Sequence, residues 1–157
     1  MRTSTQSTMY RVMSGAMGVV PRPPHPRDRA EARILLIEDD AAVANLVATI
    51  LEAEGYAVTH AATPDETRRL LSGRGPTAFD LVLSTPFTHA PAAPYVWFDE
   101  LCAYTRAPIV ICARCRPLAY ADYRRRGYAA FLEEPFDVED LINVVAAVCP
   151  LRRVTQG

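Results

Sequence analysis

Short apolar runs alternate with longer amphipathic segments from Ala32 onward. The apolar runs predict five strands, at 33–37, 56–61, 79–84, 108–112 and 129–133. Apolar residues recurring at helical spacing predict five helices: one that ends at Gly55, then 64–71, 95–104, 118–126 and one that starts after Asp137. Strands that alternate with helices form a parallel sheet covered on both faces, so we expect an α/β fold.

The first thirty residues differ from this pattern. They are rich in Ser, Thr, Met and Arg, and 21–29 contains four prolines, which disfavour both helix and strand hydrogen bonding. We therefore expect a disordered tail and linker at 1–31, one domain at 32–150 and a C-terminal tail at 151–157. No run of apolar residues is long enough to span a bilayer.

Composition narrows the possible functions. The net charge is −1, and all 17 basic residues are arginine. Such a balance gives no reason to expect binding to nucleic acid, and Arg124-Arg125-Arg126 fits a solvated helix end. Four cysteines are too few for a disulfide scaffold, and a zinc ribbon would need a second pair besides Cys112 and Cys115. We expect reduced thiols.

Function in a parallel α/β sheet lies at the carboxyl ends of the strands. The first predicted strand ends in Glu38-Asp39-Asp40. Adjacent carboxylates commonly coexist around a divalent cation, although Asp39 or Asp40 also suits the N-cap of the next helix. Downstream, Thr63-Pro64-Asp65-Glu66 has the pattern of a capping box.

Four segments carry a family resemblance: ILLIEDD at 34–40, FDLVLSTP at 79–86, APIVICAR at 107–114 and GYAAFLEEPFDVEDLINVV at 127–145. Together they resemble the receiver domain of two-component response regulators over about residues 32–149. The resemblance implies a flavodoxin-like five-stranded sheet of order 2-1-3-4-5. It also implies a cytoplasmic, non-enzymatic signalling protein in a phosphorelay.

In that family two acids after strand 1 hold Mg²⁺, and an aspartate ending strand 3 accepts a phosphoryl group from a histidine kinase. The acid pair maps onto Glu38 and Asp39. The acceptor position maps onto Thr85. Asp80 cannot replace the missing aspartate, because five residues of strand put it roughly 16 Å away.

Three further family positions lie on the last two strands. The hydroxyl position maps onto Cys112 counted from strand 5, or onto Ala113 counted from Pro108. The phosphate-binding lysine maps onto Glu134. A cis peptide is expected at Pro135, which follows Glu134, and the aromatic residue that changes rotamer maps onto Phe131.

The acceptor, the hydroxyl and the lysine are therefore all replaced. Glu134 near Glu38 and Asp39 would repel a phosphoryl group and raise the pKa values of the cluster. Either a cation or an inward arginine, Arg114 or Arg116, would relieve this repulsion. We favour the internal ion pair, so no resident cofactor is expected and bound Mg²⁺ is doubtful.

The preferred hypothesis is a degenerate receiver that acts alone as a regulator or adaptor, by binding a protein. The partner would be a histidine kinase or a downstream regulator. The face of helix 4, strand 5 and helix 5, with Phe131, Pro135 and Phe136, would bind that partner or a second copy. The alternatives are phosphorylation at Thr85 or Ser84, or a ligand-binding or enzymatic use of the same fold, for example with flavin.

Overall fold

The computed structural model describes residues 31–85, 94–113 and 127–151. Its centre is a parallel five-stranded sheet of order β2-β1-β3-β4-β5. The strands are β1 (Arg33–Ile37), β2 (Ala57–Ala61), β3 (Leu81–Ser84), β4 (Ile109–Ala113) and β5 (Ala130–Glu133). This order confirms the predicted fold class, and each strand lies within two residues of its predicted start.

The described helices are α2 (Ala41–Ala53), α3 (Pro64–Arg74), α4 (Pro94–Tyr104) and α5 (Val138–Val148). The helix predicted at 118–126 lies outside the described residues, as do the predicted tails 1–31 and 151–157 except for residues 31 and 151. Helix α3 runs three residues past the predicted end at Leu71. It passes Gly73 and stops at Gly75, whose φ of 89° breaks the helical conformation. None of the described helices is long and apolar enough to cross a membrane.

Side chains cap three of these helices. Asp40 is the N-cap of α2 and accepts hydrogen bonds from the N–H groups of Ala42 and Val43. Asp137 forms a full capping box at the start of α5. The box predicted at Thr63 is only half formed, because the Glu66 carboxylate accepts from Ala62 N–H instead of from the N-cap residue.

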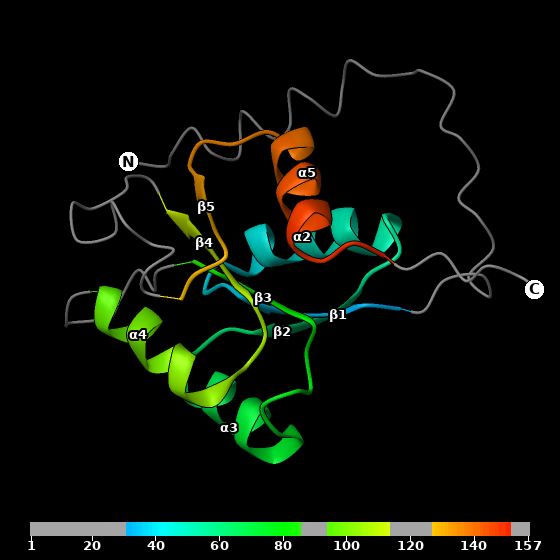
Figure 1. Ribbon diagram of the computed structural model, residues 1–157. Helices are drawn as coiled ribbons and strands as arrows, with labels where there is room; N and C mark the ends of the chain where they lie inside the picture. The colour runs from blue at the N-terminus through cyan, green and yellow to red at the C-terminus, as the bar shows by residue number, and fades with distance from the viewer. Residues whose placement is uncertain (1–30, 86–93, 114–126, 152–157) are drawn as a thin grey trace, which may run out of the picture.

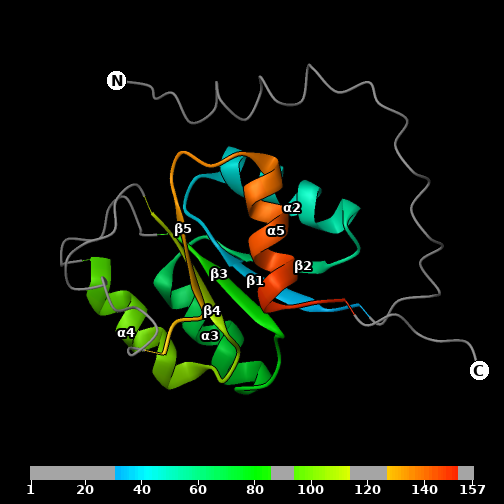
Figure 2. The same ribbon diagram turned by 45° about the horizontal axis from the view of Figure 1, so that its top comes forward.

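The sheet separates two apolar layers. Helices α2 and α5 cover one face, and α3 and α4 cover the other (Figures 1 and 2). Alternation along β1 distributes the side chains: Ile34 and Leu36 pack towards α2 and α5, while Leu35 and Ile37 pack towards α3 and α4. Burial on both faces explains why the strands are continuous apolar runs.

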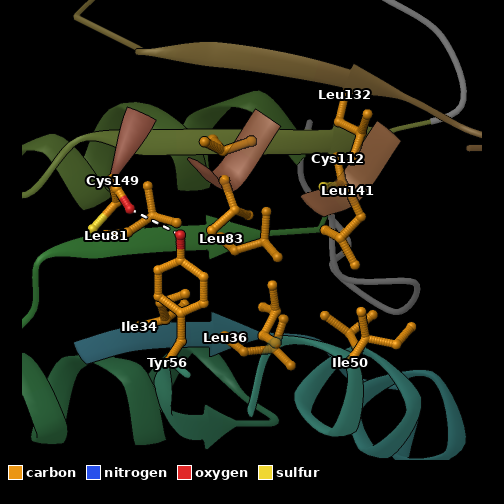
Figure 3. Packing of buried hydrophobic residues seen from close by; sticks show 14 of the residues in the cluster. Ile34, Leu36, Ile50, Tyr56, Leu81, Leu83, Cys112, Leu132, Leu141 and Cys149 are labelled. Carbon is orange, nitrogen blue, oxygen red and sulfur yellow. Dashed lines mark hydrogen bonds between the residues drawn. The ribbon is translucent and has the colours of Figure 1, made fainter. Parts of the chain in front are cut away.

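A buried hydrogen bond ties the end of α5 to the sheet. The Tyr56 hydroxyl, just before β2, donates to the backbone carbonyl of Cys149 at 2.9 Å, as Figure 3 shows. The bond satisfies a carbonyl left without an intrahelical partner at the C-cap of α5.

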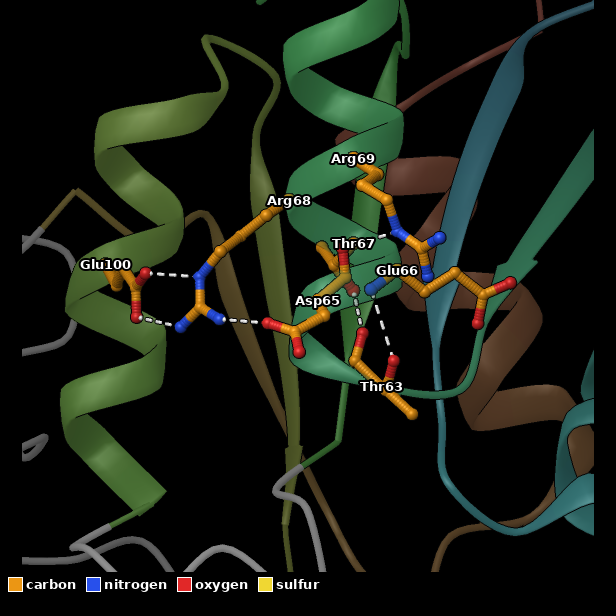
Figure 4. A network of polar contacts seen from close by, with 7 residues as sticks. All are labelled: Thr63, Asp65, Glu66, Thr67, Arg68, Arg69 and Glu100. Carbon is orange, nitrogen blue, oxygen red and sulfur yellow. Dashed lines mark hydrogen bonds and ion pairs between the residues drawn. The ribbon is translucent and has the colours of Figure 1, made fainter.

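An ion-pair network joins α3 to α4 on the other face. Arg68 donates to both carboxylate oxygens of Glu100, at 2.7 and 3.0 Å, and to Asp65 at 2.8 Å (Figure 4). Its guanidinium carbon lies 5.4 Å from the ring centroid of Trp97, which is buried in α4. These contacts hold α4 against α3.

Candidate functional site

The parallel register brings the predicted site residues together at the carboxyl ends of the strands. Ile37 of β1 lies opposite Ser84 of β3, which in turn lies opposite Ile111 of β4. Cys112 lies opposite Leu132 of β5. The carboxyl ends of four neighbouring strands therefore lie side by side. Ala113 is the last residue of β4, and Glu38, Thr85 and Glu134 directly follow β1, β3 and β5.

Glu38 is a buried carboxyl group, 6% exposed. It accepts a hydrogen bond from Asp40 N–H at 2.9 Å. The pKa of Glu38 is raised to about 7, chiefly by burial and in smaller part by the neighbouring Asp39, while Asp40 N–H and the Thr85 hydroxyl oppose the rise. The predicted increase in pKa is therefore present at Glu38, and protonation of Glu38 below about pH 7 would lessen the repulsion.

Thr85 occupies the acceptor position at the end of β3. Its hydroxyl donates to the backbone carbonyl of Ile37 at 3.1 Å, and its N–H donates to the same carbonyl at 3.0 Å. Both groups thus bind the neighbouring strand. The adjacent Ser84 is fully buried.

Asp80 lies at the amino end of β3, as predicted. Its carboxylate accepts from the Arg33 backbone N–H at 2.7 Å and from the Arg33 guanidinium at 3.2 Å. Arg33 lowers the pKa of Asp80. This carboxylate is paired with Arg33 at the amino ends of the strands, so it cannot reach the acceptor position at their carboxyl ends.

Both candidates for the hydroxyl position are buried. Cys112 is 1% exposed and Ala113, the last residue of β4, is 7% exposed. Burial raises the pKa of the Cys112 thiol well above its usual value, and the charges of Glu134 and Glu38 raise it further. The thiol is therefore neutral and unreactive at physiological pH, and Cys115 lies outside the described residues.

Glu134 follows β5 and is half-buried. Its N–H donates to Ala113 O at 2.8 Å, and its peptide bond to Pro135 is cis, as predicted. Its charge and that of Glu38 both act on Cys112, so the three groups share one electrostatic environment. This shared effect on Cys112 is consistent with the prediction that Glu38 and Glu134 lie near each other at the carboxyl ends of the strands.

A divalent cation fits this donor set poorly. Mg²⁺ prefers several oxygen ligands in octahedral geometry, whereas the acceptor position supplies a threonine whose hydroxyl is bound to Ile37 O. Among the described residues, no group of three or more His, Cys, Asp or Glu side chains is placed to hold a metal ion. Arg114 and Arg116, the predicted counter-ions, lie outside the described residues, so the internal ion pair stays a prediction.

The predicted interface residues differ in exposure. Phe131 is partly buried against the layer of α3 and α4, and Pro135 is exposed. Phe136 lies in the core beneath α2 and α5 and is 7% exposed, so it supports the surface from within. The predicted fourth helix of that face, 118–126, is outside the described residues.

His60 is a neighbour of the site that the sequence prediction missed. Its Nε2 donates to the Glu38 backbone carbonyl at 2.7 Å from the end of β2. The parallel pairing of β2 with β1 gives the signal that would have found it, because Leu36 lies opposite His60.

No family model matches the sequence, and no curated protein matches it. Solved structures do match. NtrX from Brucella abortus is 25% identical with a TM-score of 0.65, over 76% of this chain and 27% of that one. Chemotaxis protein CheY4 from Vibrio cholerae is 22% identical with a TM-score of 0.61, over 76% of this chain and 99% of that one.

A third structure is described as a CheY-like response regulator receiver domain protein. It comes from Methanospirillum hungatei JF-1 and is 22% identical with a TM-score of 0.63, over 75% of this chain and 93% of that one. This chain has the fold of a response-regulator receiver domain. Glu38 and Thr85 lie at the carboxyl ends of its strands, and their roles stay predictions.

Proposed function

We propose that this receiver-like domain is a pseudo-receiver: a signalling module that binds a protein partner and is not phosphorylated on aspartate. The observation that carries the proposal is Thr85 at the end of β3, with its hydroxyl bound to Ile37 O. An acyl phosphate requires a carboxylate at that place, and the nearest carboxylate on the same strand segment, Asp80, is paired with Arg33 at the opposite edge.

The charge of the pocket supports the same function. Glu134 stands at the lysine position, and Glu38 and Asp39 stand across from it at the end of β1. Negative groups here disfavour an incoming phosphoryl group by like-charge repulsion. The domain then holds one conformation whether or not a phosphodonor is present, and its output depends on which proteins it meets.

The surface proposed for the partner surrounds β5 and the start of α5, with Phe131 and Pro135 partly or fully exposed. A cytoplasmic histidine kinase or a downstream regulator is the expected class of partner, and catalysis is not part of the proposed function.

Affinity capture with the tagged full-length chain tests this proposal. Native lysate is divided in two, and acetyl phosphate with Mg²⁺ is added to the bait in one half. A Phe131→Ala bait is compared with Tyr104→Ala, a matched control, because both aromatic residues are partly buried against the same apolar layer. We expect the same partner in both halves, lost only with Phe131→Ala. Capture that depends on acetyl phosphate, or that is equal for both variants, would contradict the proposal.

Phosphorylation of a hydroxyl group is the second candidate function. Ser84 is fully buried, so Thr85 is the only one of the two predicted residues that solvent reaches. Thr85 would need a general base, and Glu38, whose pKa is raised to about 7, could serve only if the Thr85 hydroxyl turned its proton from Ile37 O towards Glu38. Comparison of the wild type with Thr85→Val after incubation with a phosphodonor separates this candidate from the pseudo-receiver.

A further inference from the structure

The outer surface of helices α2 and α5 is uncharged over most of its length. Residues 41–51 and 141–149 contain no Asp, Glu, Lys or Arg, and we call their outer surface the α2–α5 face. Surface helices usually turn charged side chains to solvent. On the other side of the sheet, α3 carries five charged side chains and α4 carries two. The α2–α5 face is formed instead mostly by exposed alanine, with Asn45, Thr49 and Asn143.

Larger apolar side chains of the same two helices are only partly buried. Val43 and Leu46 of α2, and Ile142, Val144 and Val148 of α5, pack against the apolar layer beneath them but stay partly exposed. Figures 1 and 2 show both helices on one face of the sheet, with no other described helix or strand outside them. Exposed apolar surfaces of this kind mark places where another segment binds.

The first twenty residues contain a segment suited to this face. Six apolar side chains between residues 9 and 20 follow the i, i+3, i+4, i+7, i+8, i+11 spacing of one side of a helix. They are Met9, Val12, Met13, Ala16, Met17 and Val20. All four methionines of the chain lie within residues 1–17, and flexible methionine side chains adapt to irregular apolar surfaces. This spacing is typical of helices that bind by laying an apolar stripe on an apolar surface.

The tail joins the domain at the same apolar layer. Ala32 packs against that layer, and its carbonyl accepts a hydrogen bond from Ala57 N–H at 2.9 Å. Residues 21–31, which include four prolines, would span up to about 34 Å in an extended polyproline conformation. Helix α2 has 13 residues and is about 20 Å long. The linker is therefore long enough for residues 9–20 to reach the α2–α5 face.

Charge also favours contact between the tail and the domain. Residues 1–30 contain five arginines and one acid, whereas the described residues contain sixteen acids and five arginines. Opposite net charges attract the tail to the domain, and the linker keeps its local concentration high.

We propose that residues 9–20 bind the α2–α5 face of their own chain as an amphipathic helix. The contact is separate from the partner surface proposed around β5. It makes residues 9–20 an ordered part of the tail predicted at 1–31.

Amide hydrogen exchange of the full-length chain tests this contact. We expect the amides of 9–20 to exchange at least about tenfold more slowly than in the urea-unfolded chain, at every protein concentration. Met13→Glu, on the apolar stripe, and Ala146→Glu, on the α2–α5 face, each remove this protection. Two matched controls keep it: Ser14→Glu lies off the stripe, and Ala103→Glu replaces an exposed alanine of α4 on the other side of the sheet.

Protection of 9–20 that appears only at high protein concentration would mean that a second copy covers the face, and would overturn the proposal. An unprotected segment would overturn it too. So would protection that survives Met13→Glu or Ala146→Glu, or that is lost in either control.

Trypsin gives a second readout, because Arg11 lies inside the segment and Arg2 lies outside it. We expect cleavage after Arg11 to be about tenfold slower than cleavage after Arg2 in the wild type, and equally fast in Met13→Glu. Equal rates at the two arginines in the wild type would contradict the proposed contact.

Discussion

The carboxyl groups at the two ends of the central strands differ in exposure, in pairing and in the direction of their pKa shift. At the amino end, Asp80 is 42% exposed and is paired with Arg33, which lowers its pKa. At the carboxyl end, Glu38 is 6% exposed and lies beside Asp39, and its pKa rises to about 7. The same sheet thus favours the ionised form of Asp80 and the protonated form of Glu38.

The difference supports the proposal that the functional site lies at the carboxyl ends of the strands. An exposed ion pair such as Arg33–Asp80 contributes little and is easily replaced. A buried carboxyl group with a raised pKa costs stability when it ionises, and such groups gather at binding and catalytic sites. That end carries Glu38 and Asp39, which we map onto the acid pair of a receiver domain. In the proposed function, Thr85 and Glu134 stand there in place of the family's aspartate and lysine.

Replacing Glu38 is expected to have the largest effect. A carboxyl group whose pKa is higher in the folded state binds its proton more tightly there, so the free energy of unfolding falls as pH rises from about 4.5 to about 7. Glu38→Gln removes this dependence and is more stable than the wild type at pH 8 by about 2 kcal/mol, with little difference at pH 4.5.

Urea unfolding of both proteins at several pH values, in buffer with EDTA, measures this difference. If the difference in stability between wild type and Glu38→Gln is the same at every pH, burial does not shift the titration of Glu38.

An aspartate at position 85 would increase the difference between the two ends, because it adds negative charge at the carboxyl end. Thr85→Asp adds a third acid beside Glu38 and removes the hydrogen bond to Ile37 O, so we expect a loss of about 1–2 kcal/mol without metal. Mg²⁺ at millimolar concentration should raise the melting temperature of this variant while leaving that of the wild type unchanged.

Thr85→Asn is the matched control for this experiment, because asparagine has nearly the same shape as aspartate but carries no charge. A response of the wild type to micromolar Mg²⁺ would show that Glu38 and Asp39 alone hold the ion.

Replacing Asp80 is expected to have the smallest effect. A carboxylate with a lowered pKa stabilises the fold above its unfolded pKa, and this stabilisation is lost as pH falls through its folded pKa. Asp80→Asn therefore loses about 0.5–1 kcal/mol at pH 7, a value limited by solvent screening, and nothing near pH 2. Thermal unfolding at the two pH values tests this, and Arg33→Gln should match it at pH 7.

Much of the fold could be predicted from sequence because it depends on local patterns. Buried parallel strands need apolar runs on both faces, and the run at 33–37 shows this directly. The stop of α3 was less predictable. Gly73 and Gly75 are both candidate helix ends, and only the backbone conformation reveals that Gly75 adopts a positive φ.

The site was predicted in part. The alignment of strand ends follows from topology, so the convergence of Glu38 and Thr85 was foreseeable. Three features depend on side-chain direction and were not: the bond from Thr85 to Ile37 O, the contact of His60 with Glu38 O, and the burial of Phe136. Each is set by packing between segments distant in sequence, which periodicity does not report.

The most direct test of the account is the intact mass of the wild-type chain after incubation with acetyl phosphate and Mg²⁺. A receiver domain that retains its aspartate serves as the positive control in the same incubation. We predict no added phosphoryl group on this chain while the control is modified. An added phosphoryl group that hydroxylamine removes would mean an acyl phosphate, and would contradict the proposal that this domain works without aspartyl phosphorylation.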